Sequence, residues 1–309
     1  MRIIQSANPR PLDLLALGPN GLIAAAGSTF GADGGVEVWD AGSGALRWGS
    51  APDRARVESV AFTHSGRYLL LGGWGDNVLA LADAELIRRQ DDYALSWFRF
   101  APAADGSRLL VGDSATCVGA AKCLATDGEL EFHSLWGDGG TSHRWFDSFA
   151  LSPDGRRAAF AEHSEFPIGR PARVLRFRDA STGTYVFSIP LAPADPIRQL
   201  AFTADGEKLL ARTDSRTVRL FDATTGTTAG ELVHPGRPFV TGVAVHPRGP
   251  VACARTNGTV TFWDPDTREQ LRTFDWQAGK LVSVALSPDG ALAAAGTEDG
   301  QIVVWDVDF

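Results

Sequence analysis

The chain has 309 residues, of which 44% are hydrophobic and 21% charged, and its formal net charge is −8 at pH 7. This apolar content excludes a disordered chain, and the negative charge disfavours a general nucleic-acid binder. No apolar run reaches the roughly 20 residues that a membrane-spanning helix needs, and the apolar stretch at the N-terminus is too short for a signal peptide. We therefore expect a cytoplasmic, monomeric globular protein that contacts neither nucleic acid nor membrane. Arginine far outnumbers lysine among its 29 basic residues, which together with abundant Ala and Gly is typical of a GC-rich bacterial coding sequence.

The first repeated element along the chain is an apolar run that ends in a short turn closed by glycine. It occurs seven times, and the closing glycines are Gly21, Gly66, Gly106, Gly155, Gly206, Gly249 and Gly290. Successive glycines are 45, 40, 49, 51, 43 and 41 residues apart, and the distance across the two chain ends is 40. A period of this length predicts an all-β ring of seven four-stranded antiparallel blades, a β-propeller formed as one domain by residues 1–309.

The last unit shows what such a blade contains. Its three segments LVSVALSPDG, ALAAAGTEDG and QIVVWDVDF each contain one strand, and the chain then ends. The fourth strand has to come from elsewhere, and residues 1–8 belong to no other unit. We expect these N-terminal residues to supply the outer strand of the last blade, which would also protect an open sheet edge.

A Trp-Asp dipeptide recurs at the end of the third strand of several units. It is present at Trp39-Asp40, Trp263-Asp264 and Trp305-Asp306, with Phe221-Asp222 as a conservative variant. Turn sequences such as DAGSG, DASTG and DATTG accompany it. Together with the period, these motifs resemble the WD40-repeat β-propeller family over essentially the whole chain. The repeated Trp is predicted to lie in the core.

The chain departs from that family in the polar groups that usually surround the Trp. The resemblance implies a Gly-His pair before the first strand, Ser or Thr on the second strand and Asp in the following turn. The positions of the His are occupied by Gln277 and Gly236, and those of the Ser or Thr by Ala295, Cys253 and Ala211. Asp299 retains the turn carboxylate, whereas blade six has Asn257 there. We therefore expect a divergent member whose stability comes mainly from apolar packing between blades.

Large aromatic residues occur in the loops expected on one face of the ring. Exposed aromatic groups mark binding surfaces, so these residues and two nearby arginines are candidates for contacting a partner: Phe30, Trp74, Trp145, Phe166, Phe239, Trp276, Arg170 and Arg173. The alternative for each single ring is that it folds down and covers its own blade.

The fourth unit contains the densest cluster of chemically active side chains: His143, Asp147, His163 and Glu165. Imidazole and carboxylate groups suit a divalent metal or a general base with its orienting acid. Their spacing matches no metal motif, and no nucleophile motif accompanies them, so solvated loop polarity is favoured. We predict no metal and no catalytic residue.

The segment Trp39–Trp48 is similar to the tryptophan-docking turn of quinoprotein propellers, but only one unit carries its final Trp. We interpret it as structural and predict no cofactor. The function that best fits the sequence is a non-catalytic scaffold or adaptor that binds a protein or peptide through the loop face. The alternative is a propeller enzyme, or a protein that binds a small ligand or metal at the channel mouth near blade four.

Overall fold

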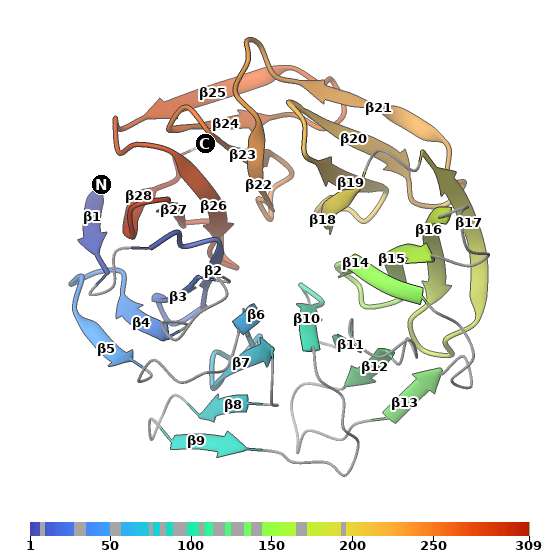
Figure 1. Ribbon diagram of the computed structural model, residues 1–309, viewed down its shortest axis with the longest axis horizontal. Coiled ribbons are helices and arrows are strands. Elements are labelled where there is room, and N and C mark those ends of the chain that lie inside the picture. Colours follow the sequence, from blue (N-terminus) through green and yellow to red (C-terminus); the bar gives the residue numbers. More distant parts are fainter. Residues whose placement is uncertain are drawn as a thin grey trace.

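The computed structural model describes residues 1–6, 10–27, 35–49, 57–73, 77–80, 85–88, 98–104, 108–113, 121–124, 133–136, 144–164, 172–192 and 196–308. These ranges form 28 strands in seven four-stranded antiparallel sheets, arranged around a common centre (Figure 1). The predicted seven-bladed all-β architecture is confirmed. None of the described segments is a helix with the length and apolar character needed to cross a membrane.

Each of the first six blades is formed by four consecutive strands. Blades one to three are β2 (Leu14–Leu17), β3 (Leu22–Ala26), β4 (Val36–Asp40), β5 (Leu46–Gly49); β6 (Val57–Phe62), β7 (Tyr68–Gly73), β8 (Asn77–Ala80), β9 (Glu85–Arg88); and β10 (Phe98–Pro102), β11 (Leu109–Asp113), β12 (Ala121–Leu124), β13 (His133–Trp136). Blades four to six are β14 (Arg144–Leu151), β15 (Arg157–Ser164), β16 (Ala172–Asp179), β17 (Tyr185–Leu191); β18 (Ile197–Phe202), β19 (Lys208–Thr213), β20 (Thr217–Asp222), β21 (Thr228–Val233); and β22 (Val240–Val245), β23 (Val251–Arg255), β24 (Thr259–Trp263), β25 (Gln270–Asp275).

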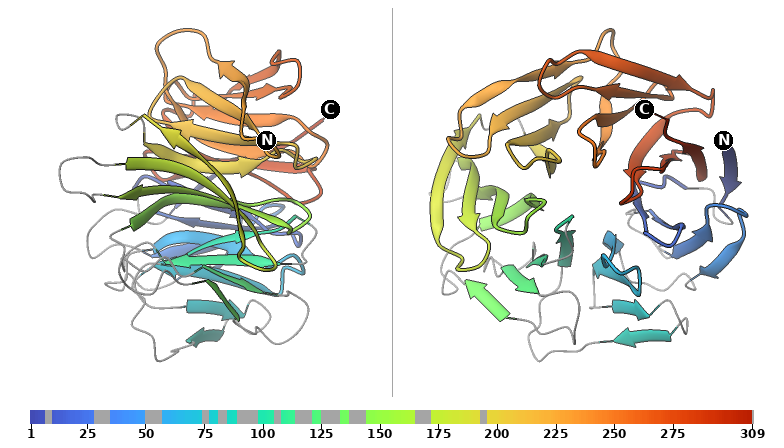
Figure 2. Two further views of the ribbon diagram at one scale, coloured as in Figure 1. Left: turned by 90° about the vertical axis from the view of Figure 1, so that its right-hand side faces the viewer. Right: turned by 180° about the vertical axis from the view of Figure 1, so that it is seen from behind.

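Blade seven combines both ends of the chain. Its strands are β26 (Leu281–Leu286), β27 (Leu292–Thr297), β28 (Gln301–Asp306) and the N-terminal β1 (Arg2–Gln5). β1 pairs antiparallel with β28, with Ile4 opposite Ile302, and both termini lie beside this blade in Figure 2. The prediction that N-terminal residues complete the last blade is confirmed.

The turn between the first and second strand of a blade requires a backbone conformation that glycine adopts without strain. Gly155 and Gly206, for example, have φ values of 65° and 73°, and each donates its N–H to the carbonyl three residues earlier. This turn chemistry explains why the glycine repeat marks the blades. Of the seven glycines, Gly106 lies outside the described residues.

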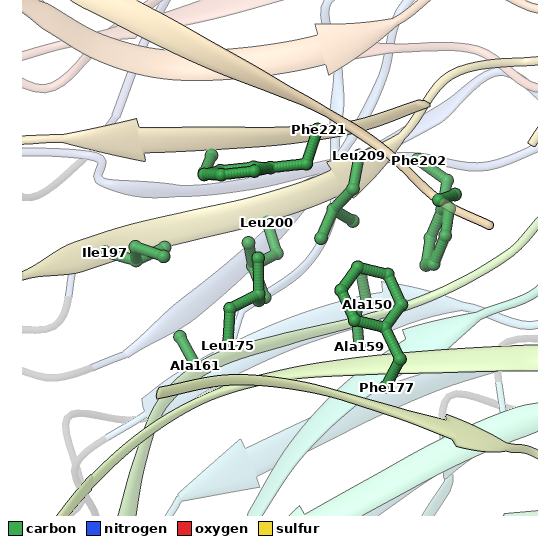
Figure 3. Packing of buried hydrophobic residues seen from close by; sticks show 12 residues of the cluster. Ala150, Ala159, Ala161, Leu175, Phe177, Ile197, Leu200, Phe202, Leu209 and Phe221 are labelled. Carbon is green, nitrogen blue, oxygen red and sulfur yellow. The ribbon is translucent and has the colours of Figure 1, made fainter. Parts of the chain in front are cut away.

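The hydrophobic core lies between neighbouring blades rather than at the centre of the ring. Between blades four and five, for example, Leu175 and Phe177 face Leu200, Phe202 and Leu209, all nearly inaccessible to solvent (Figure 3). The repeated aromatic residue packs against the preceding blade: Phe221, Trp263 and Trp305 belong to the cores between blades four and five, five and six, and six and seven.

The Asp that follows the repeated aromatic residue holds the next turn. In blade four, Asp179 Oδ1 accepts hydrogen bonds from the N–H groups of Ser181 and Thr182, both at 2.9 Å. Asp222 makes the equivalent bonds in blade five. The hydrogen bond from the Ser181 hydroxyl, together with these N–H bonds, lowers the pKa of the Asp179 carboxyl, and the N–H bonds lower the pKa of Asp222. The register shows that Arg178-Asp179 occupies the Trp-Asp position of blade four, a position that the sequence motif does not reveal.

Candidate functional site at the channel mouth

The first strands of the blades line a central channel with an open volume of about 690 Å³. In five of these strands, β6, β14, β18, β22 and β26, the pairing with the second strand skips one residue. The skipped residues are Glu58, Asp147, Arg198, Thr241 and Val282. A β-bulge changes the direction of a side chain, and four of these five residues line the channel. We call the face where the first strands begin the mouth face.

The residue after the bulge ties one inner strand to the next. Leu200 N–H donates to Ser148 Oγ at 3.0 Å, and Phe100 N–H donates to Ser59 Oγ at 3.0 Å. Gln199 bonds both the N–H and the carbonyl of Val243, at 3.0 and 2.7 Å. In blades two and five the bulge therefore separates two roles: Glu58 and Arg198 face the channel, and the residue after each joins neighbouring blades.

Three polar groups meet in blade four on the mouth face. Asp147 Oδ1 lies 3.0 Å from His163 Nδ1, and Asp147 Oδ2 accepts a hydrogen bond from Arg173 Nη1. His163 and Arg173 are Cα partners on β15 and β16. The sequence placed His163 and Arg173 in a loop, and this is corrected: both lie on strands, which fixes them beside Asp147.

This arrangement leaves the Asp147 carboxylate occupied on both oxygens. A cation at this position would have to displace the Arg173 guanidinium. The described residues contain no group of three or more His, Cys, Asp or Glu side chains that could hold a metal ion. His143 and Glu165, the other two members of the predicted cluster, lie outside the described residues. The geometry thus supports a fixed polar cluster.

The candidate aromatic residues do not share one environment. Phe239 precedes β22 and is 55% exposed on the mouth face. Trp276, by contrast, is half-buried, because its ring lies 5.4 Å from that of Phe274 and 4.3 Å from that of Trp305. The sequence suggested that Trp145 precedes the first strand of blade four, but it lies within that strand, β14. The remaining candidates, Phe30, Trp74, Phe166 and Arg170, lie outside the described residues.

Blade five contributes a charged group to the mouth face. Arg198, the bulged residue, pairs with Asp214 through Nη2 and Nε at 2.7 and 2.8 Å from the same oxygen, Oδ2. Arg212, near the end of β19, also lines the channel and donates from Nη1 to the Val240 carbonyl in blade six at 3.3 Å. Burial lowers the pKa of Arg212 to about 10.

A polar network around the repeated Trp exists in blade six, which corrects the expectation from sequence. Trp263 Nε1 donates to Thr261 Oγ1 at 3.1 Å, and this hydroxyl lies 3.2 Å from Nδ1 of the buried His234. Thr261 is the Cα partner of Cys253, the position where the family has its hydroxyl. The hydroxyl is therefore on the third strand of the blade instead of the second. His234 lies two residues before Gly236, the position at which the family resemblance implies a His.

The charged and polar residues of the channel were missed by sequence reasoning, although a signal for them exists. The inner strands align as VESVAF, FDSFAL, IRQLAF, VTGVAV and LVSVAL. Only the second and third columns interrupt the apolar pattern. The second column contains the bulged residue, and the third contains the residue that follows it. Arg212 gives no comparable signal, since its burial depends on how blades five and six meet.

Comparison with known proteins agrees with this architecture. Residues 268–306 match the family model described as WD domain, G-beta repeat. The chain is 32% identical over 130 residues to WD repeat-containing protein SL1-17 of Schistosoma mansoni, covering 42% of each protein. It is 33% identical over 75 residues to ribosome biogenesis protein ENP2 of Chaetomium thermophilum, covering 24% of this chain and 11% of that protein. The matches thus span less than half the length of these relatives.

A solved structure is similar over the full length. The β-propeller domain of Cps50 (Swd1) from Myceliophteria thermophila superposes with a TM-score of 0.71, covering 99% of this chain and 100% of that one at 16% identity. At this identity the likeness concerns the fold alone. The repeat match, the WD-repeat relatives and the seven-sheet ring agree with one another, and together they support a WD40-repeat β-propeller.

Proposed function

We propose that this protein is a non-catalytic interaction module that binds a protein or peptide partner on its mouth face. The observation that carries the proposal is a contrast between equivalent positions in the first strands of the blades. The flanking apolar positions repeat from blade to blade, whereas the bulged residue changes among Glu58, Asp147, Arg198, Thr241 and Val282. A repeated scaffold that presents a different group at each blade suits recognition of one extended surface.

Two further features support a partner on this face. Phe239 exposes an aromatic ring on the mouth face, and exposed aromatic groups are enriched at binding hot spots. One relative is named for ribosome biogenesis, a process of macromolecular assembly. Trp74 and the other candidate residues outside the described ranges remain predictions from the sequence.

Affinity purification of the tagged full-length protein from its source cells tests the proposal. Phe239→Ala should lose a partner that the unchanged protein retains. Tyr185→Ala is the matched control, because Tyr185 is a 51% exposed aromatic residue at the opposite end of its blade. Equal recovery with Phe239→Ala and with the unchanged protein would contradict a partner at this position.

The second candidate is a small ligand or metal at blade four, and the His163–Asp147 contact favours it. Metal analysis of the protein purified without chelators, beside an Asp147→Asn variant, tests it. Stoichiometric metal that is lost in the variant would support this candidate, and absence of metal from both proteins would contradict its metal-binding form.

A further inference from the structure

Arg212 occupies an unusual position at the mouth of the channel. It comes from the second strand of blade five, but its Nη1 reaches the first strand of blade six at the Val240 carbonyl. Thr241, the next residue, is the bulged position of blade six and lines the same channel. Arg212 and Thr241 therefore lie on two sides of one blade boundary, beside the channel opening.

Both side chains have hydrogen-bonding capacity that the protein does not use. Arg212 Nε and Thr241 Oγ1 are shielded from solvent, and neither has a hydrogen-bond partner in the described part of the chain. Burying polar groups without partners is unfavourable, and a buried charge without a counter-charge more so. Arg212 as a whole is only partly covered and faces the channel, so a molecule entering the channel can reach it.

The Asp214 carboxylate attracts Arg212, but no ion pair joins the two in the described part of the chain. Asp214 directs one oxygen to both Nη2 and Nε of Arg198 and is itself 57% exposed. The desolvation of Arg212 outweighs the attraction of Asp214, which is why its pKa falls instead of rising. Two arginines and one aspartate leave one positive charge at this boundary.

We propose that the mouth between blades five and six binds a carboxylate from an acidic segment of the partner, with Arg212 as its ion-pair partner and Thr241, once its side chain rotates toward the channel, as its hydroxyl donor. This assignment rests on the proposed function, and it specifies which chemical group of the protein's partner is bound. A guanidinium and a hydroxyl are suitable donors for a carboxylate, and pairing would relieve the burial of Arg212.

The charge around the site favours a single negative charge. Asp13 and Glu58 line the same channel, and the hydrogen bond to Asp214, with a smaller contribution from Asp147, raises the pKa of Arg198. A phosphate group brings about two negative charges at neutral pH and would approach these carboxylates, whereas Arg212 supplies one positive charge. An Asp or Glu side chain balances the charge of Arg212.

Titration of the full-length protein with two capped tripeptides, Gly-Glu-Gly and Gly-Gln-Gly, tests the assignment directly. The reporters are the nuclear magnetic resonance signals of Arg212 Nε–H and of the Thr241 backbone amide. The Glu peptide should shift both signals saturably, and the uncharged Gln peptide should shift neither over the same concentrations. Inorganic phosphate at equal ionic strength should bind more weakly than the Glu peptide.

Variants separate this site from general attraction by basic residues. Arg212→Met should weaken Glu-peptide binding about ten-fold or more, read from the Thr241 signal. Arg216→Met is the matched control, because Arg216 is an exposed arginine near the same face with one bond, to the Gly236 carbonyl. It should leave the affinity unchanged. The free Arg212→Met protein should melt at the same or a higher temperature, since an uncompensated buried charge is removed.

The results divide clearly. No saturable shift, an equal response to the Gln peptide, or unchanged affinity in Arg212→Met would overturn the site, and tighter phosphate binding would overturn its assignment to a carboxylate. The titration needs no partner. A failed titration, with a partner still captured through Phe239, would reject the site and leave the proposed function standing.

Discussion

Blades six and seven hold the same repeated tryptophan in two different ways. In blade six, Trp263 donates to Thr261, which in turn contacts the buried His234. In blade seven, Trp305 Nε1 is buried and has no hydrogen-bond partner in the described ranges, while the rings of Trp276 and Phe274 lie 4.3 and 5.9 Å from its own. Both tryptophans are nearly inaccessible to solvent.

The difference shows which property of the repeat is essential here. Both indoles fill the space against the preceding blade, so the volume is retained in each case. The polar network is present in one blade and replaced by aromatic packing in the other. We infer that packing between blades is the common requirement and that the network adds stability where it occurs.

The largest expected effect comes from removing the shared element. Trp263→Ala and Trp305→Ala should each lower the free energy of unfolding by about 3–5 kcal/mol, because each leaves a large cavity between two blades. Chemical denaturation of the two variants measures this. A loss below about 1 kcal/mol in either blade would contradict the common packing role.

A pH effect should come next in size and should be specific to blade six. Burial lowers the pKa of His234 to about 4, from an ordinary value of 6.5. Between these values the unfolded chain binds a proton that the folded protein does not. Stability is therefore complete above about pH 6.5 and should fall by roughly 3 kcal/mol as the pH decreases to 4.

Unfolding at a series of pH values measures this dependence. His234→Gln should make the decline between pH 6.5 and 4 shallower, and His64→Gln, at an exposed position, should not change it. The pKa of His246 is also lowered by burial, so part of the decline should persist. An unchanged slope in His234→Gln would show that His234 is not buried in its neutral form.

Thr261→Val should have a smaller effect, since it keeps the shape of the side chain and removes only the hydroxyl. Trp263 Nε1 and His234 Nδ1 then lose their shared partner inside the protein. The expected loss is about 1–3 kcal/mol. Thermal and chemical unfolding both measure it, and a neutral result would mean that the network contributes nothing to stability.

The smallest effect is expected from transferring the hydroxyl to blade seven. Val303 is two residues before Trp305 and opposite Ala295, as Thr261 is two residues before Trp263 and opposite Cys253. Val303→Thr would offer an acceptor to Trp305 Nε1 and should change stability by less than about 1 kcal/mol. Val218→Thr, at an equally buried position, should be clearly destabilising. Equal losses in both variants would show that the blade-seven indole does not use the new hydroxyl.

The parts of the fold that depend on local chemistry could be predicted from the sequence. The glycine turns, the Trp-Asp positions and the pairing of the N-terminal strand follow from residues that act within one blade or from the period itself. The motif of blade four is not recognisable from the sequence, because Arg178 stands where Trp39, Phe221, Trp263 and Trp305 stand in four other blades.

The parts that depend on contacts between blades were harder to predict. His234 belongs to a loop after blade five but packs in blade six, so no local pattern reveals its role. Arg212 lies near the end of a strand, where many arginines are solvated. It is buried only because blades five and six pack together at this position. The bulged column of the inner strands could have been found by aligning the repeats, since four of its five residues are polar within an apolar run.

Site-specific photo-cross-linking tests the central claim, that a partner occupies the mouth face, most directly. A photoreactive phenylalanine placed at Phe239 should cross-link a partner in source cells, and the same group at Tyr185 should not. Cross-linking from position 185 alone would place the partner at the opposite end of the blades and contradict the account. Absence of any adduct at position 239, in cells where the tagged protein still captures a partner, would contradict it equally.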